Sequence, residues 1–388
     1  MSDLLPPDGL LLPEGTRLIH VGPPKTATTS LQAAFHEARP RLAPYGVHYA
    51  GTRRHEMLAA IAAVGGKGFL GGPEPQQDAW AELLTDIHGA ADQRVVFSSE
   101  YLAQAKPPRV RSITEQIGGH QHVVLTLRPL DKLIPSQWQQ YVQTGYAIAY
   151  DDWLEAMFSP SPPKGLTPTF WTRHHHDRLA ARWAAEVGEE NVTVVVLDSR
   201  DHAMVLRVFE AMVGLPDGTL ALQDDLSNRS LTLAEIEIVR EFNRIYKASD
   251  WPSDVHFRYL RNGVVRNLRT RQPDRSEPKI VTPTWAQERI AELSQEVVDN
   301  LRASGVRVVG DLDGLLAGPV VPAEPQTDDD RAVSAEVAAL ALAGAIAQTG
   351  VPATDAKARR AWRTVRQTPT RDLVTLARKR MRRRLARR

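Results

Sequence analysis

The sequence of 388 residues contains no cysteine and no long apolar run. The absence of cysteine excludes disulfide bonds and thiolate-bound metals, and we expect no metal in this protein. Residues 1–8 lack the basic and apolar segments of a secretory signal. The uncharged run over residues 337–350 is too short and too rich in alanine to span a membrane. We therefore expect a cytoplasmic protein.

Charge is distributed unevenly, although the formal net charge is only +2. Residues 355–388 contain 14 lysines and arginines against two aspartates, which leaves 34 basic and 44 acidic residues in the rest of the chain. The body is thus acidic and the tail strongly basic, a pattern typical of an interaction tail. Hydrophobic content of 42% and charged content of 24% are ordinary for a large globular domain with appendages.

The basic tail carries a narrow apolar stripe. Four apolar residues recur at intervals of four and are bordered by arginines: Leu373, Ala377, Met381 and Leu385. This spacing predicts a helix that lies on an anionic membrane surface, so we expect a peripheral position at the inner membrane face. Trp362 is the tail's one aromatic residue, which argues against stacking on nucleic-acid bases. A solvated tail and an acidic partner stay open as alternatives.

The stretch of residues 17–32 organises the rest of the chain. An apolar strand over residues 18–21 is followed by a turn at residues 22–24 and by a helix that opens at residues 28–30. Hydroxyl residues at a helix start are expected to cap its free N–H groups. Those donors and the helix dipole also favour phosphate, and Lys25 adds a positive charge at the rim. We predict that a phosphate group lies over residues 22–30.

The loop is not a Walker A motif, because Lys25 comes three residues after Gly22 and the later Gly-Lys pair is absent. It resembles the 5′-phosphosulfate loop of sulfotransferases that use PAPS (3′-phosphoadenosine 5′-phosphosulfate), whose pattern is roughly P-K-[ST]-[GA]-[ST]-[ST]-[SL]-L. Ala27 stands where glycine is usual. The resemblance implies that the 5′-phosphosulfate is bound by Gly22, Pro24, Lys25, Thr26, Ala27, Thr28, Thr29 and Ser30.

A second stretch supports this resemblance. The apolar run over residues 122–127 predicts a buried parallel strand that ends at Arg128, and Ser136 follows eight residues later in a predicted helix over 131–143. The same family places an arginine and a serine at this spacing on the 3′-phosphate of the nucleotide. An arginine fork suits a phosphate monoester. The alternative is a surface arginine that caps a helix.

Strands alternate with helices along the chain, which predicts an α/β fold with a doubly wound, mainly parallel sheet and a P-loop-like phosphosulfate loop. The resemblance extends more weakly over most of residues 17–316. It implies that Arg229 closes over the nucleotide, whereas a turn with a helix cap at Thr232 is the alternative. The predicted layout is a lead-in (1–16), the α/β domain (17–316), a linker (317–330), an alanine-rich helix capped by residues 328–330 (331–350) and a basic amphipathic tail (351–388).

The reaction that the resemblance implies is transfer of a sulfuryl group from PAPS to a hydroxyl of a glycan, glycolipid or related acceptor. Lys25 would stabilise the charge that develops on the leaving group. The general base is open among Glu100, His55 and Glu56. Two other functions also stay open: a P-loop kinase that needs magnesium, and a non-catalytic nucleotide-binding scaffold. The adjacent histidines at 174–176 point in different directions on a helix and favour no metal site.

Overall fold

The computed structural model describes residues 9–66, 77–161, 163, 166, 169–222, 229–324 and 326–349. The strands are β1 (Arg17–Gly22), β2 (Val47–Tyr49), β3 (Arg94–Ser98), β4 (Gln121–Leu127), β5 (Val192–Val196) and β6 (Arg307–Val309). The first nine helices are α1 (Thr28–Ala38), α2 (Met57–Ala63), α3 (Gln77–Gly89), α4 (Pro107–Ile117), α5 (Leu130–Gln143), α6 (Tyr150–Phe158), α7 (Phe170–His174), α8 (His176–Val187) and α9 (Met204–Val213). The later ones are α10 (Leu233–Lys247), α11 (Ser253–Val255), the π-helix η6 (His256–Val265), α12 (Arg266–Leu268), α13 (Thr284–Ala303) and α14 (Ala335–Ile346). Short 3₁₀ turns are η1 (Arg39–Arg41), η2 (Ala43–Tyr45), η3 (Glu100–Gln104), η4 (Glu189–Asn191) and η7 (Leu312–Leu315).

The six strands form one parallel sheet in the order β2-β3-β1-β4-β5-β6. This topology confirms the predicted α/β fold with a parallel, doubly wound sheet. β1 lies between β3 and β4, so the segments after these three strands leave the sheet at the same edge. In open α/β sheets, ligands bind at this carboxyl edge.

Both faces of the sheet are buried. Successive side chains of each strand point to opposite faces, and each face packs against a layer of helices. One face packs Leu18, Val96 and Val124 against α1 and α9. The other packs Ile19 and Val123 against α4, α8 and α13. The near-continuous apolar strands in the sequence are thus explained by burial on both sides.

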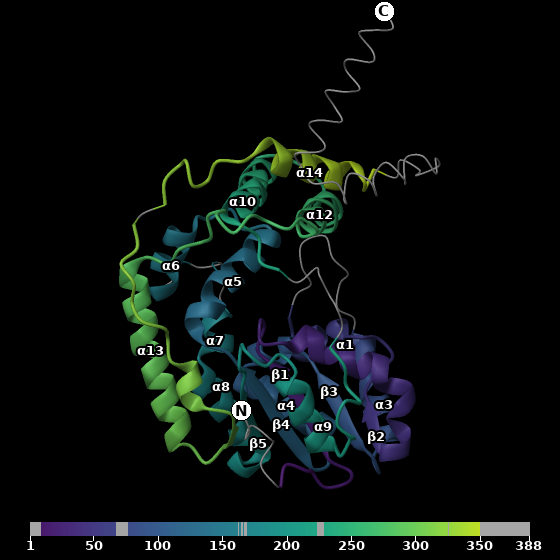
Figure 1. Cartoon of the computed structure of the whole chain (residues 1–388). Helices are drawn as coiled ribbons and strands as arrows, with labels where there is room; N and C mark the ends of the chain where they lie inside the picture. Colours follow the sequence, from purple (N-terminus) through teal and green to yellow (C-terminus); the bar gives the residue numbers. More distant parts are fainter. Residues whose placement is uncertain are drawn as a thin grey trace, which may run out of the picture.

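A third core lies outside the sheet and is formed mainly by helices. Figure 1 shows α10, α12 and α14 together at one end of the molecule, with α5, α6 and α7 between them and the sheet. α14 packs closely on η6, since a Cβ on Gly263 would lie 2.7 Å from the Gly344 carbonyl oxygen. Asn267 also donates to the Leu340 carbonyl at 2.7 Å. The alanine-rich helix is therefore part of this helical layer.

Two local predictions differ from the structure. The cap of α14 is Ser334, whose hydroxyl accepts from the Val337 N–H at 3.3 Å, and not residues 328–330. The helices at residues 233–271 were not foreseen beyond the cap at Thr232, which is confirmed by a capping box with Glu235. Residues 1–8 of the lead-in and the whole tail, 351–388, lie outside the described residues. Among those described, no helix combines the length and apolar character that a membrane crossing needs.

Candidate active site

The predicted phosphate loop follows the central strand and lies between the ends of its two neighbours. Gly22 is paired with Leu125 of β4, so the loop runs beside Arg128, which directly follows that strand. On the other side, Glu100 opens η3 just after β3. Gly22 has a φ of +85°, and a Cβ there would lie 3.0 Å from the Glu100 Cα. Glycine therefore permits the close approach of the loop to η3.

A chain of buried polar groups ties the loop to the sheet beneath it. His20 Nδ1 hydrogen-bonds to Ser98 Oγ at 2.8 Å, and its Nε2 to Thr126 Oγ1 at 3.0 Å. The Thr126 hydroxyl donates to the Thr26 carbonyl at 2.9 Å, and the Thr26 hydroxyl donates to the Pro23 carbonyl at 2.6 Å. Burial lowers the pKa of His20 to about 3, so this ring is neutral. The Thr26 hydroxyl is buried and does not face a ligand over the loop.

The loop backbone is left-handed at two positions, with φ of +73° at Lys25 and +62° at Ala27. Ala27 is the N-cap of α1, and no side chain caps this helix. The prediction that hydroxyls at 28–30 cap it is therefore wrong; the Thr28 hydroxyl donates back to the Pro23 carbonyl at 3.5 Å. The first-turn N–H groups of α1 lack a side-chain acceptor, which suits an anionic ligand.

Replacing Ala27 with glycine is expected to stabilise the protein by about 0.5–1 kcal/mol. The left-handed conformation costs alanine about 1–2 kcal/mol, whereas the freedom of glycine in the unfolded chain costs about 0.4–1 kcal/mol. Urea denaturation measures the change. The matched control is Ala33→Gly inside α1, where glycine should cost about 1 kcal/mol or more. Equal losses of stability in Ala27→Gly and Ala33→Gly would contradict the inference that the left-handed backbone at Ala27 is strained.

Lys25 lies half-buried among other charges at the rim of the loop. Burial lowers its pKa to about 8; the positive charges of Arg269 and Arg128 add to this effect, and Glu100 opposes it. Within the described part of the chain, the Lys25 ammonium makes no hydrogen bond or ion pair. A bound anion would restore the high pKa of Lys25, so this charge is available to a ligand.

Arg128 and Ser136 are also open donors. Ser136 lies in α5, the helix that begins two residues after Arg128. Burial lowers the pKa of the Arg128 guanidinium, and the Asp131 carboxylate opposes the shift. Neither the Arg128 guanidinium nor the Ser136 hydroxyl hydrogen-bonds to another described residue. A half-buried guanidinium with unused N–H groups is well suited to a phosphate.

Two of the three base candidates lie against each other. His55 Nε2 is 3.6 Å from Glu100 Oε2 and 2.9 Å from Ser99 Oγ. The Gln32 amide donates to Glu100 Oε2 at 3.3 Å, and the His55 ring stacks on Tyr101 with centroids 5.9 Å apart. The side chains of His55 and Glu100 are 17% and 24% exposed, so both are held in place and still accessible.

Glu56 has a different environment. Its Oε1 accepts the backbone N–H groups of Thr52 and Arg53, each at 2.8 Å. The carboxylate fits under Gly51, where a Cβ would lie 2.4 Å from Oε1. Glu56 therefore closes the turn that precedes α2 and positions His55 beside it.

The structure uses Arg229 in a way that the sequence did not predict. All five N–H groups of its guanidinium donate to protein acceptors: both oxygens of Glu235 at 2.7 Å, and the carbonyls of Ser230, Leu268 and Arg271. No donor is left for a nucleotide phosphate. Arg229 instead compensates the fully buried carboxylate of Glu235, which Arg271 also contacts at 3.0 Å.

Replacing Arg229 with alanine is expected to destabilise the protein by about 2 kcal/mol without weakening nucleotide binding by the folded protein. Removing one partner of a buried carboxylate costs about 3–5 kcal/mol, and Arg271 retains part of the compensation. Denaturant titration and nucleotide calorimetry measure the two quantities. The pair of Arg200 with Asp198 at the surface provides the control, since Arg200→Ala should hardly change stability. Loss of nucleotide binding in folded Arg229→Ala would restore the original prediction.

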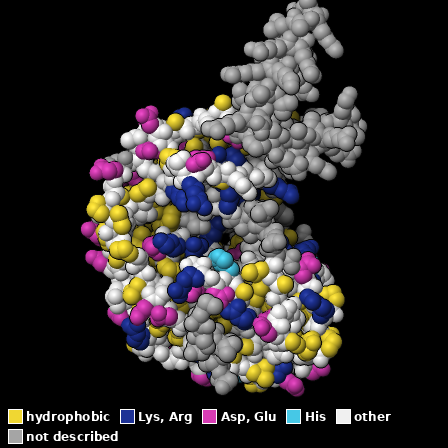
Figure 2. Space-filling model, viewed as in Figure 1, with side chains coloured by type: hydrophobic (Ala, Val, Ile, Leu, Met, Phe, Trp, Pro, Cys, Tyr) yellow, Lys and Arg dark blue, Asp and Glu magenta, His cyan; other side chains and the backbone are white. Residues whose placement is uncertain are grey.

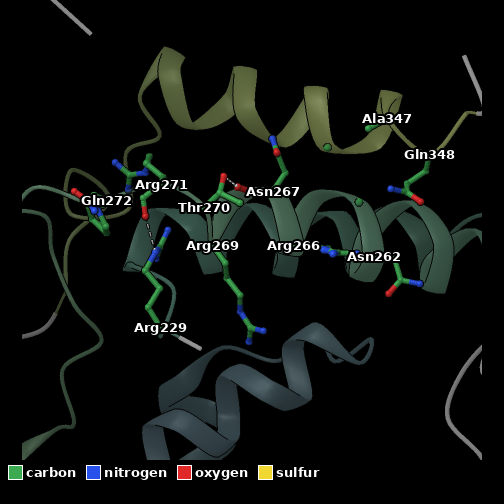
Figure 3. Close-up of a pocket in the computed structure, with 13 residues that line it drawn as sticks. Arg229, Asn262, Arg266, Asn267, Arg269, Thr270, Arg271, Gln272, Ala347 and Gln348 are labelled. Atoms are coloured by element: carbon green, nitrogen blue, oxygen red, sulfur yellow. Dashed lines mark hydrogen bonds between the residues drawn. The ribbon is translucent and has the colours of Figure 1, made fainter. Parts of the chain in front are cut away.

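Three arginines of the helices near the site were missed by sequence reasoning. Arg269 donates to Gln143 of α5 at 3.0 Å, and Figure 3 shows it pointing from its helix toward the helix below. Burial and the charge of Glu100 raise the pKa of Tyr101, and the charges of Arg261 and Arg173 oppose this shift. Figure 2 shows Lys and Arg side chains gathered around the hollow on this face. For Arg261 and Arg269, the signal in the sequence was the density of arginine over residues 256–271.

Aromatic rings lie against two of the three histidines at 174–176, and the His175 Nδ1 also lies 4.0 Å from the Asp177 carboxylate. His174 contacts the Phe170 ring at 4.8 Å between centroids, and His175 contacts Trp171 at 5.0 Å. Burial lowers the pKa of His174 and that of His176, the latter to about 4. Within the described ranges, no group of three His, Asp or Glu side chains is arranged to hold a metal ion.

Comparison with known proteins gives little beyond this geometry. No protein-family model matches the chain, and no curated protein matches it. Among solved structures, a sulfotransferase from Alicyclobacillus acidocaldarius is similar at 16% identity and a TM-score of 0.38, over 60% of this chain and 91% of that one. This is a distant likeness and carries no argument about activity, so the functional conclusion depends on the residues of the site.

Proposed function

We propose that this protein is a PAPS-dependent sulfotransferase. The observation that carries the proposal is a set of donors at one edge of the sheet that hydrogen-bond to no other described residue: Lys25, Arg128, Ser136 and the N–H groups of Thr28 and Thr29 in the first turn of α1. Two separate anionic groups of one nucleotide would use these donors. A Walker A loop with its magnesium-binding pattern is absent from the sequence.

The 5′-phosphosulfate would lie over Gly22 and residues 24–30, bound by backbone N–H groups and by Lys25. Thr26 would contribute only its N–H group, because its hydroxyl is bound to the Pro23 carbonyl. The 3′-phosphate would accept hydrogen bonds from Arg128 and Ser136. PAPS needs no metal for this mode of binding, since the protein supplies the positive charge.

In the proposed reaction an acceptor hydroxyl oxygen attacks sulfur, and the bond from sulfur to the bridging oxygen of the 5′-phosphate breaks. The electron pair stays on that oxygen, where Lys25 stabilises it, and PAP (adenosine 3′,5′-bisphosphate) leaves. The acceptor proton passes to Glu100. We favour Glu100 over His55 because the charge of Glu100 raises the pKa of Lys25, which relates this carboxylate to the leaving-group cation, whereas His55 is held by Glu100 and Ser99.

The test is calorimetric titration of the protein with PAP, ADP and ATP in EDTA. PAP should bind more tightly than ADP or ATP. The Arg128→Ala substitution should weaken PAP binding by about 100-fold or more, as expected for the loss of two hydrogen bonds to a charged phosphate. Arg200→Ala is the matched control, because its guanidinium is exposed and bound to Asp198. Preference for ATP that depends on magnesium would instead identify a kinase.

We propose a glycan, glycolipid or related hydroxyl compound as the acceptor, reached at the inner membrane face through the basic tail. Deleting residues 355–388 should abolish binding to liposomes that contain anionic lipid, because the deletion removes 14 positive charges. PAP affinity should not change. Sedimentation with liposomes measures the first quantity, and undiminished sedimentation would contradict the membrane role. A PAP-binding protein with no transfer activity toward any acceptor would be the non-catalytic scaffold.

A further inference from the structure

One face of α14 is apolar and exposed. Glu336 is the one charged residue of this helix. Four apolar residues recur along it at intervals of four, three and four, and all four are exposed: Ala335, Ala339, Leu342 and Ile346, here called the outer stripe. Leu342 is 65% exposed and Ile346 is 56% exposed. Because intervals of three and four residues return to the same side of a helix, the outer stripe forms one continuous surface.

The opposite face of α14 packs on the protein. Val337, Ala341 and Gly344 are buried, and a Cβ on Gly344 would lie 2.6 Å from the Gly263 carbonyl oxygen of η6. A helix that is apolar all round is usually covered on every side, either by a protein core or by a membrane. In the part of the chain that the structure describes, no residue covers the outer stripe. Its partner is therefore to be sought outside the described residues.

Positive charge accompanies this helix. A cavity of about 760 Å³ beside α14 has Gly344, Gln348 and Arg266 among its lining residues (Figure 3). The Arg266 side chain is exposed and makes no ion pair with another described residue. In the sequence, residues 355–388 follow shortly after α14 and carry 14 lysines and arginines. An apolar helix face accompanied by cations is typical of a helix that lies in the surface of an anionic membrane.

Two protein partners fit these observations less well. A stable interface between two copies of a chain takes about 20–30 residues from each side, whereas the outer stripe offers four residues, of which two are alanines. The apolar stripe predicted for the basic tail is bordered by arginines, and α14 offers only Glu336 as a counter-charge. A membrane that contains anionic lipid receives apolar side chains and cations at one surface.

We propose that α14 lies flat in the headgroup region of an anionic membrane, with Leu342 and Ile346 inserted at the level of the acyl chains and Arg266 bound to a lipid phosphate. An apolar insertion combined with a basic segment gives stable attachment, whereas one such signal alone gives weak and reversible binding. The inference rests on the membrane role proposed above for the tail and adds a surface of the folded domain to it.

The experiment detects insertion at a single position of the full chain. Because the protein has no cysteine, Leu342→Cys can be labelled there alone with the fluorophore NBD, whose emission increases in apolar surroundings. On liposomes of phosphatidylglycerol and phosphatidylcholine, this emission should increase about twofold or more. Liposomes of phosphatidylcholine alone should leave it unchanged. The matched control is Ala81→Cys, an exposed position on α3, which lies away from α14 (Figure 1).

Sedimentation with the same liposomes tests the contribution of the surface to affinity. The double variant Leu342→Ser/Ile346→Ser should bind about tenfold more weakly or worse, because two apolar side chains no longer leave water. Arg266→Gln should bind about fivefold more weakly. The control is Val320→Ser/Val321→Ser, which changes two exposed apolar residues outside α14 and should bind as the wild type does.

Sedimentation of the protein with liposomes while the label at position 342 stays in water would overturn the inference and leave the tail as the attachment. A label that is shielded before liposomes are added would also overturn it. Shielding that grows with protein concentration would identify a second copy as the partner, and shielding that is lost on deletion of residues 355–388 would identify the tail. Failure of the wild type to sediment with anionic liposomes would overturn this inference and the membrane role together, whereas PAP binding tests the sulfotransferase function separately.

Discussion

Replacing Lys25 with alanine is expected to lower kcat for sulfuryl transfer by about 10²–10³ and to weaken PAP binding much less. The charge on the bridging oxygen develops only as the bond to sulfur breaks, so a cation placed there acts mainly on the transition state. The N–H groups of the loop still hold the phosphate in the ground state. Steady-state kinetics and PAP calorimetry separate the two effects. Lys279→Ala, which removes an exposed lysine, is the control.

The pH profile gives a second readout for Lys25. Its pKa is lowered to about 8 in the free protein, so its charge is present below pH 8 and is lost as the pH rises through that value. The ratio kcat/KM reports the free enzyme and should fall above about pH 8. The kcat profile should fall only at higher pH, because bound PAPS raises the pKa. An unchanged kcat together with a large loss of PAP affinity would show that Lys25 only binds the ground state.

Replacing Glu100 with glutamine is expected to lower kcat by about 10²–10⁴, the range for loss of a general base. Glutamine keeps the shape and can still accept from Gln32, so the loss should come from the missing proton acceptor. His55→Gln should have a smaller effect, about tenfold, if the imidazole only orients Glu100. Single-turnover transfer to the best acceptor measures both. If His55→Gln lowers kcat more than Glu100→Gln does, His55 is the general base and Glu100 orients it.

Glu56→Gln is the matched control for this prediction. Glu56 is next to His55 in sequence, but its carboxylate accepts the N–H groups of Thr52 and Arg53. Its replacement should lower stability by about 1 kcal/mol and leave kcat within a few-fold of the wild type. A loss of rate as large as that of Glu100→Gln would mean that the turn before α2 belongs to the catalytic site.

Local patterns predicted the parts of the site that are close in sequence. The strand, loop and helix over residues 17–32 and the strand that ends at Arg128 follow from apolar runs and turn residues. Their meeting at one edge follows from the rules for parallel sheets. The contact of His55 with Glu100 joins residues 45 positions apart and has no local signature. Two candidates that were open alternatives in the sequence are therefore neighbours in the structure.

Polar residues inside strands were the signal that sequence reasoning did not use. His20 and Thr126 each interrupt an apolar strand, and the structure joins them beneath the loop. Arg229 is the reverse case, a polar residue that was given a ligand-binding role that its contacts do not support. A basic residue near a predicted nucleotide was assigned to the ligand, but the buried Glu235 takes its donors. Whether an arginine is free for a ligand depends on carboxylates elsewhere in the fold, which no local pattern reveals.

The close packing of Gly263 on Gly344 has a mechanical consequence. α14 is the last described helix before the tail, and it packs on η6 with no room for even one methyl group between the two backbones. Under the proposed role of the tail, a pull on the tail would be borne by two helices whose backbones are in direct contact, so α14 would be displaced only together with η6.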